Sequence, residues 1–433
     1  MKLTRVFAFM AMAGLATSAF ATNGYFSHGY GMKAKGMAGA STANIDDAFG
    51  GANNPATMAF AGNRMELGLD VFSPIRTASS TNAIGGFGPV EVESDSNYFF
   101  IPEFAYNRMI NNDLALGVTV YGNGGMNTNY APFFEGANLC GIPGGTSTNL
   151  HCGDGRLGVD LMQLIVAPTA SYKIAPNHSI GVAPLLGYQM FEAEGLQLFQ
   201  GFSIDPQNVT NNGSDGAFGF GVRVGYYGQL TPTVSVGAAY ASKMNFSEFD
   251  DYAGLFAEGG DFDIPENWNL GVSWQATPQL RLAADYQRIN FSDVNAVGNP
   301  VFANLPNGMG ADNGPGFGWD DVDVWKLGIE YKHSNQWTLR AGYSYADNPI
   351  SGGGFPPAAD FGEVTLNMLA PAVIKHHMTL GFTYTLGSGN EVTMAYMHAF
   401  ENDVSGPSFF DPTATDTITM HQNALGVQYS WKM

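Results

Sequence analysis

Most of the chain alternates between apolar and polar residues with a period of two, which is the pattern of β-strands that bury one face. Fourteen such segments follow one another, and the connections between them are alternately short and long. The short connections, such as NRMINND and QLTPT, are rich in the Asn, Gly and Pro residues that tight turns need. The sequence therefore predicts fourteen antiparallel strands. Their spans are 64–75, 97–107, 113–122, 157–174, 178–199, 215–230, 233–248, 263–276, 279–293, 319–333, 336–347, 372–387, 389–402 and 413–433.

The alternation divides each predicted strand into two faces. In residues 217–227, Arg223 shares one face with Ala and Gly residues, whereas every residue of the other face is large and apolar. An apolar outer face suits lipid, and polar residues that point inward suit the lumen of a closed barrel. The acidic residues Glu66, Asp70 and Glu103 fall on the inward face, where we expect them to pair with basic groups. By the same count the inward basic residues are Arg223, Lys243, Arg281, Lys326 and Arg340.

Composition favours a membrane barrel over a large secreted β-protein. Charged residues make up 13% of the chain, about half the usual share of a soluble domain, aromatic residues also make up 13%, and there are 56 Gly residues. After the first 21 residues no apolar run is long enough for a transmembrane helix. The net charge of −20 argues against nucleic-acid partners, which require basic patches. The predicted fold class is all-β, a 14-stranded antiparallel transmembrane β-barrel.

Residues 1–21 have the features of a secretory signal peptide. Lys2 and Arg5 precede an apolar run, and Ala19-Phe20-Ala21 supplies the small residues of a cleavage site. The apolar run is too short to span a bilayer stably, so a membrane anchor is the weaker alternative. We expect this segment to direct export and to be removed.

Residues 22–62 fit neither periodic pattern. This stretch is dense in Gly, Ala and Asn, with no sustained helical stripe and no strand alternation. Because Gly and Ala bring little apolar area and Gly loses the most backbone entropy on ordering, the stretch cannot form a core of its own. We expect it to lie as a plug, or hatch, inside a barrel made by residues 63–433.

The two cysteines, Cys140 and Cys152, lie in a Gly-, Pro- and Thr-rich loop, CGIPGGTSTNLHC. In an exported protein such a close pair most simply forms a disulfide. A metal site that also used His151 would lack a fourth ligand. The sequence contains no nucleophile-elbow, phosphate-loop or zinc-protease motif, so it predicts neither an enzyme nor a metal or cofactor.

The segment FSHGYGMKAKGMAGASTANIDDAFGGANNPATMAF resembles the N-terminal plug of the FadL/TodX family of outer-membrane transporters. The shared features are the acidic pair Asp46-Asp47, followed by Ala48, and the motif formed by Asn54, Pro55 and Ala56. The similarity extends along the whole chain after the leader and includes GRLGVDLMQLIVAPTASYKI, the strand count and a long loop after the third strand.

The resemblance implies passive uptake of long-chain fatty acids or other hydrophobic molecules across the bacterial outer membrane. It also implies that the ligand leaves sideways, through a gap where the third strand kinks inward. In this sequence Gly122, Asn123, Gly124 and Gly125 break the alternation of that strand, and Gly within a strand usually marks a bulge or bend. The alternative is that the strand simply ends at Tyr121 and the Gly cluster is loop.

Several residues are candidates for contact with an apolar ligand. Tyr25, Phe26, Tyr30 and Met32 of the plug are expected beside the ligand pocket, although they could equally anchor the plug. A ligand carboxylate would prefer an inward cation. The basic candidates are Arg223, Lys243 and Arg281, and the aromatic candidates in the long loop after the third strand are Phe133 and Phe134.

The resemblance leaves the cargo and some partners open. Aromatic or alkane hydrocarbons are alternative cargoes, and a general porin or a surface receptor is an alternative function. The Asn54-Pro55-Ala56 turn is expected to lie against the kinked strand, with Asn54 bonded to main chain. We expect a monomer surrounded by outer-membrane lipid and lipopolysaccharide.

Overall fold

The computed structural model describes residues 22–83 and 86–433. The proposed signal peptide, residues 1–21, lies outside the described residues. Among the described residues, no helix is long and apolar enough to cross a membrane.

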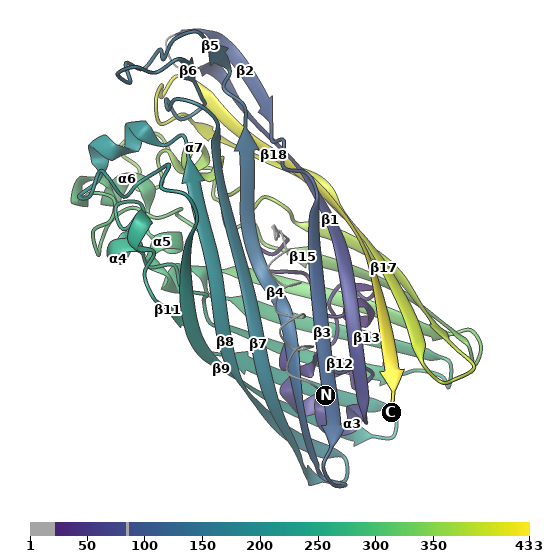
Figure 1. Ribbon diagram of the computed structural model, residues 1–433. Helices are drawn as coiled ribbons and strands as arrows, with labels where there is room; N and C mark the ends of the chain where they lie inside the picture. The colour runs from purple at the N-terminus through teal and green to yellow at the C-terminus, as the bar shows by residue number, and fades with distance from the viewer. Residues whose placement is uncertain (1–21, 84–85) are drawn as a thin grey trace.

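Fourteen antiparallel strands close into a barrel (Figure 1). Each strand pairs with the next along the chain, β9 pairs with β10, and β18 pairs with β1 to close the cylinder. The fourteen-strand prediction is therefore confirmed. The barrel strands are β1 (Arg64–Ala83), β3 (Phe99–Met109), β4 (Leu114–Tyr130), β7 (Leu157–Ala175), β8 (His178–Glu194), β9 (Asp215–Thr231), β10 (Val234–Ala241), β12 (Asn267–Gln275), β13 (Leu280–Ile289), β14 (Val322–Lys332), β15 (Trp337–Ala346), β16 (His376–Thr385), β17 (Glu391–Pro407) and β18 (Thr415–Lys432).

In the part of the chain that the structure describes, the long connections between the barrel strands contain four small strands and eight short helices. Figure 1 shows these connections gathered at one end of the barrel, which we call the long-loop end. The opposite end, with the tight turns, is the short-turn end. The small strands are β2 (Gly88–Glu93), β5 (Phe134–Glu135), β6 (Ser147–Thr148) and β11 (Asn245–Phe246), and the short helices are η3 (Gln197–Phe202), η4 (Asp250–Tyr252), α4 (Ala257–Gly260), η5 (Phe291–Asp293), α5 (Asn295–Gly298), α6 (Val301–Asn304), η6 (Leu305–Asn307) and α7 (Glu363–Asn367).

The two faces of the wall follow the sequence alternation. In β9, Phe218 is 73% exposed on the outer face, whereas Arg223 is 3% exposed in the lumen. Exposed apolar side chains cover the outer face of other strands as well, as lipid requires. Examples from β14, β16 and β18 are Leu327, Ile329, Leu380, Leu425 and Val427.

Some strands are longer than the alternation predicts. β1 continues from residue 75 to Ala83, because it pairs there with β18 and β2 at the level of the loops. β4 continues to Tyr130, so the alternative that this strand ends at Tyr121 is wrong. A register shift lies in β17 between Ala399 and Asn402.

Residues 22–62, the plug segment, lie inside the barrel. Their backbone amides donate to inward side chains from opposite parts of the wall: Ser41 and Thr42 donate to Asp285 of β13, each at 2.8 Å, and Ala59 donates to Ser171 of β7 at 3.1 Å. The segment contains four short helical turns, which are α2 (Met32–Lys35), η1 (Phe49–Gly51), η2 (Pro55–Thr57) and α3 (Met58–Ala61). The wall thus supplies hydrogen-bond partners to a segment that has little secondary structure of its own.

Candidate functional site

The barrel wall is interrupted between β3 and β4. These strands share a ladder at the short-turn end, and its last pair is Phe104–Val120. Beyond this pair, in the described part of the chain, β3 pairs with β1 alone and β4 with β7 alone. A bridge between Ser94 and Tyr130 joins the two sides again at the long-loop end. Figure 1 shows the two strands diverging between these points, and we call this interruption the wall gap.

A β-bulge in β4 marks the start of the wall gap. Gly122 pairs with Leu164 and Gly124 pairs with Gln163, so Asn123 is an extra residue between two consecutive pairs. Such an insertion bends the strand that carries it and increases its twist. The bend falls at the Gly-rich break that the sequence analysis named as the lateral-opening candidate.

The start of the plug segment occupies the wall gap. Phe26 forms an antiparallel β-bridge with Gly124 of β4. Ser27 N donates to the backbone oxygen of Asn123 at 3.2 Å, and the Tyr30 hydroxyl donates to the same oxygen at 3.1 Å. The plug segment therefore acts as a short extra strand on the free side of β4, where β3 has separated from it.

Gly124 has no room for a side chain. A Cβ atom at this position would lie 1.7 Å from the backbone oxygen of Tyr25, far closer than any real contact. That oxygen accepts a hydrogen bond from Gly125 N at 3.2 Å. A glycine at 124 is thus what lets the plug segment approach β4 closely enough to pair with it.

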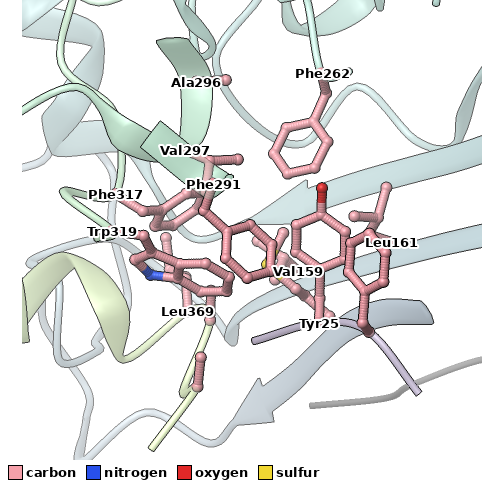
Figure 2. Packing of buried hydrophobic residues seen from close by; sticks show 14 of the residues in the cluster. Tyr25, Val159, Leu161, Phe262, Phe291, Ala296, Val297, Phe317, Trp319 and Leu369 are labelled. Carbon is pink, nitrogen blue, oxygen red and sulfur yellow. The ribbon is translucent and has the colours of Figure 1, made fainter. Parts of the chain in front are cut away.

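Behind the wall gap, Tyr25 and Phe26 belong to a cluster of buried aromatic and aliphatic side chains, which we call the apolar cluster. The Tyr25 ring lies 5.1 Å from the Phe291 ring and 6.0 Å from the Phe262 ring, and the Phe291 ring lies 5.1 Å from that of Trp319. Figure 2 shows these rings gathered around Tyr25. Further members are Val159, Leu161, Ala296, Val297, Phe317 and Leu369.

The sequence analysis missed most of the apolar cluster. Phe262, Phe291, Phe317 and Trp319 come from long connections whose Gly, Asn and Pro content is typical of exposed loops. Phe262 and Phe317 fall in predicted loops, and Phe291 and Trp319 fall at the loop-side ends of the predicted strands 279–293 and 319–333, so the alternation does not mark any of them as part of one cluster. Tyr25, Phe26 and Tyr30 were named from the sequence, and the structure brings them together at the wall gap. Met32 lies elsewhere, because its amide donates to Gln428 of β18 at 2.9 Å.

A small cavity lies beside the apolar cluster, between β1 and β4. Its lining is mostly apolar, and the only charged residue among the described residues that line it is Arg76. The lining consists of Phe72, Pro74, Arg76, Met126, Asn127, Trp319, Ala370, Pro371, Ala372 and Met420. A second small cavity lies between the plug segment and β9, β12, β13 and β14, and its lining is more polar, including Arg223 and Lys326.

The lumen is charged from the short-turn end up to the start of the wall gap. Basic residues of the plug segment and wall pair there with inward acidic residues, as expected for charges inside a membrane barrel. Glu66, Asp70 and Glu103 point inward as predicted. The ion pairs are Lys33–Glu391 at 2.7 Å, Lys35–Asp70 at 2.8 Å, Lys35–Glu103 at 2.7 Å, Arg64–Glu66 at 2.9 Å, Arg64–Glu391 at 3.2 Å, Arg281–Glu330 at 3.0 Å and Arg340–Glu330 at 2.6 Å.

The Asn54-Pro55-Ala56 turn packs against β7, β8 and β9, rather than against the kinked strand β4 as expected. The Asn54 amide nitrogen donates to Thr42 O at 2.8 Å and to Tyr226 O at 2.9 Å, and its oxygen accepts from Ala56 N at 3.1 Å. The turn fits there because Gly225 leaves room: a Cβ at 225 would lie 2.0 Å from the Asn54 side-chain oxygen. Asn54 does bond to main chain, as the sequence analysis expected.

The acidic pair Asp46-Asp47 lies at the short-turn end. The Asp46 carboxylate forms an ion pair with Arg281, and its backbone oxygen accepts from the Lys33 ammonium at 2.8 Å. The Asp47 carboxylate accepts from Phe49 N at 3.0 Å, which closes a local turn. Both carboxylates therefore help to fix the plug segment to itself and to the wall.

The three basic ligand candidates do not share one place. The Arg223 guanidinium donates to plug backbone oxygens, at 3.2 Å in the case of Gly51. Arg281 is engaged by two carboxylates. Lys243 follows β10, at the long-loop end, and its ammonium lies 2.8 Å from a carboxylate oxygen of Asp263. No common headgroup site for the three is formed.

The loop after β4 carries the predicted aromatic pair and the disulfide. The Phe134 ring lies 5.0 Å from Phe87 of the connection between β1 and β2, and Phe133 lies 6.2 Å from the same ring. Cys140 and Cys152 form a disulfide. In the described part of the chain, no three His, Cys, Asp or Glu side chains are grouped as a metal ion would require.

The sequence matches a family model described as "Outer membrane protein transport protein (OMPP1/FadL/TodX)" over residues 8–427. Among solved structures, the toluene transporter TodX of P. putida is similar with a TM-score of 0.67 at 22% identity, over 94% of this chain and 99% of that one. Two other similar structures are the toluene transporter TbuX of Ralstonia pickettii (TM-score 0.61, 19% identity) and a FadL homologue of Pseudomonas aeruginosa (TM-score 0.66, 15% identity). Each aligns over 94% of this chain and 99% of its own chain. At these identities the likeness shows the fold. The curated proteins contain no match.

Proposed function

Because the chain belongs to the OMPP1/FadL/TodX family of outer-membrane channels for hydrophobic compounds, we propose that it takes up long-chain fatty acids and releases them sideways through the wall gap. The observation that carries this proposal is the place of residues 25–27, which pair with β4 inside the gap and have the apolar cluster behind them. Moving this short strand aside would connect the apolar cluster with the lipid around the barrel.

The chemistry of the lumen favours a sideways exit over an axial one. At the short-turn end an alkyl chain would have to pass buried ion pairs such as Lys35–Asp70 and Arg64–Glu66. Leaving each CH₂ group in polar surroundings costs about 0.8 kcal/mol, so a long chain is strongly disfavoured there. In the wall gap the same chain would meet aromatic rings on one side and lipid tails on the other.

Aromatic hydrocarbons are the alternative cargo. Two of the similar structures are described as toluene transporters, and a third as a FadL homologue. The apolar cluster suits either type of molecule, since its rings offer no obligatory polar contact. A general porin agrees less well with a lumen that the plug segment occupies, whereas a receptor role for the outer loops is compatible with transport.

The test is uptake of radiolabelled palmitate and of toluene by cells that lack such transporters and express this chain. The informative variant deletes Asn123, the extra residue of the β4 bulge, so that β4 can run straight and pair further with β3. We expect this deletion to abolish most palmitate uptake while the barrel still folds, as judged by its heat-dependent migration on gels.

A matched control deletes Glu401, which lies in the bulge of β17, a strand that β18 and β1 separate from β3 and the gap. We expect this variant to keep most of its uptake. Toluene uptake without palmitate uptake would assign the chain to hydrocarbons. Full palmitate uptake by the Asn123 deletion would contradict release through the wall gap.

A further inference from the structure

Arg76 of β1 is a buried cation at the long-loop end of the wall gap. Its side chain is directed into the lumen, and the residue is 1% exposed. The predicted first strand ends at residue 75, so Arg76 was not among the inward basic residues expected from the sequence. In the structure β1 continues, and Arg76 pairs across the sheet with Met420 of β18.

The hydrogen-bond partners of Arg76 among the described residues are uncharged. Its guanidinium donates to the backbone oxygens of Asn127 and Ser96, and at 3.3 Å to the side-chain oxygen of Asn97. Its Nε atom is buried and has no hydrogen-bond partner in the described part of the chain. The guanidinium carbon lies 5.7 Å from the centre of the Phe99 ring, and the Asp160 and Glu93 carboxylates are in the vicinity, but neither carboxylate forms an ion pair with Arg76.

This arrangement differs from that of most lumen cations, although Arg223 and Lys326 also donate to backbone oxygens and are in no ion pair among the described residues. Lys33, Lys35, Arg64, Arg281 and Arg340 each pair with at least one carboxylate within the barrel. A buried charge without a direct ion pair is costly, because backbone dipoles and more distant carboxylates replace only part of the lost hydration. Among the described residues, the Nε–H group of Arg76 is therefore a free donor that an anion could use, although Asp160 and Glu93 already act on the guanidinium from a longer distance.

The side chain of Arg76 lines the small cavity between β1 and β4, which is otherwise built from uncharged and largely apolar residues. Trp319 connects this cavity to the apolar cluster, because it belongs to both. Met126, two residues beyond Gly124 on β4, connects it to the wall gap. The cation could therefore pair with the anionic headgroup of an amphiphile, while the apolar residues that lead from it to the wall gap could contact the alkyl chain.

We infer that Arg76 binds the carboxylate of an anionic amphiphile, with the alkyl chain directed along Trp319 and Met126 towards the wall gap. This inference rests on the proposed function and deepens it, because it makes the carboxylate a specificity determinant. A neutral hydrocarbon leaves Arg76 without its anion. The cavity is too small to hold a ligand as it stands, so the headgroup and the chain must displace side chains of its lining and of the apolar cluster.

The test is equilibrium binding in lipid nanodiscs at pH 8, with 9,10-dibromostearate and its methyl ester as probes. Bromine quenches tryptophan fluorescence on contact, and Trp319 is the reporter because it lines the cavity. The Trp319→Phe variant gives the signal of the other tryptophans. We expect the acid to bind at least about tenfold more tightly than the ester, since only the acid brings a negative charge to its hydrogen bond with Arg76.

The substitution Arg76→Gln should lower the affinity for the acid by about tenfold or more and leave that for the ester within about twofold. Arg76→Lys keeps the charge and should keep a preference for the acid. Equal affinity of the folded wild-type protein for acid and ester overturns the inference, whether or not Arg76→Gln folds. Equal weakening of both ligands by Arg76→Gln also overturns it.

The uptake assay separates this inference from the proposed function. Palmitate uptake by a protein that binds acid and ester equally overturns the role of Arg76 and leaves transport standing. Absence of uptake of palmitate overturns the proposed function itself.

Discussion

Replacing Gly124 by Ala tests whether the plug segment is held in the wall gap by its pairing with β4. The new Cβ would lie 1.7 Å from Tyr25 O and 2.7 Å from Tyr25 C, and both are backbone atoms that cannot rotate away. A tolerable contact needs a shift of more than about 1 Å, which tight packing does not absorb locally. The shift separates the short strand from β4.

The expected effect follows from the hydrogen bonds that are lost. Gly125 N donates to Tyr25 O and Ser27 N donates to Asn123 O, each at 3.2 Å. A hydrogen bond contributes about 0.5–1.5 kcal/mol net, so losing both costs about 1–3 kcal/mol. The fraction of molecules with this strand detached should then rise by roughly 5- to 150-fold.

The assay is amide hydrogen exchange with mass spectrometry, on peptides that cover residues 22–30, in nanodiscs. Exchange of these peptides should accelerate in Gly124→Ala and remain unchanged in the control Gly387→Ala, because a Cβ at 387 meets no atom within 4 Å. Unchanged exchange of residues 22–30 in a folded Gly124→Ala barrel would refute the reasoning, since the strand would then be held by something other than β4.

Three further predictions concern the plug and the loops. Asn54→Ala removes three hydrogen bonds of a fully buried side chain and should lower the free energy of unfolding in urea titrations by about 1–3 kcal/mol. The control Asn53→Ala removes one hydrogen bond of a half-buried side chain and should lower this free energy by less. Burial raises the pKa of Glu363 in α7 to about 7, so the folded protein holds a proton that is lost as the pH rises towards and through 7. The urea concentration at the unfolding midpoint should therefore decrease when the pH is raised from 5 to 8, and it should decrease less in Glu363→Gln. Cys140→Ser removes the disulfide between two residues that are 12 positions apart and should lower the free energy of unfolding of that loop by about 2–4 kcal/mol. We expect faster proteolysis within residues 131–156, while the heat-dependent gel migration of the barrel stays unchanged.

The strand pattern was predictable because lipid acts on every residue of the outer face. In β9 and β14 an apolar residue recurs at each second position, so even short segments show which side they face. The requirement for apolar residues on the outer face no longer applies where the strands extend beyond the lipid. β1 beyond residue 75 reads RTASSTNA, which has little apolar alternation, and its pairing with β18 and β2 is not visible in the sequence.

The wall gap was partly predictable, since Gly122 to Gly125 break the alternation of β4. The sequence could not show what fills the gap, because pairing between Phe26 and Gly124 joins residues about a hundred positions apart and involves backbone atoms. The apolar cluster was hidden for a related reason. Phe291 and Trp319 stand at the ends of predicted strands, but β13 ends at Ile289 and β14 begins at Val322, and the two residues join a cluster only because the barrel brings their connections together over the plug segment.

The most direct test of the central claim, release through the wall gap, is photolabelling with a palmitate analogue that carries a diazirine at the end of its chain, in outer-membrane vesicles. Mass spectrometry then locates the labelled peptides. Lateral release predicts labels in residues 22–30, 99–104 and 121–130, which border the gap, and none in residues 280–285 or 389–395 at the short-turn end. Labels along the charged short-turn lumen, with the residues of the gap unlabelled, would contradict the account.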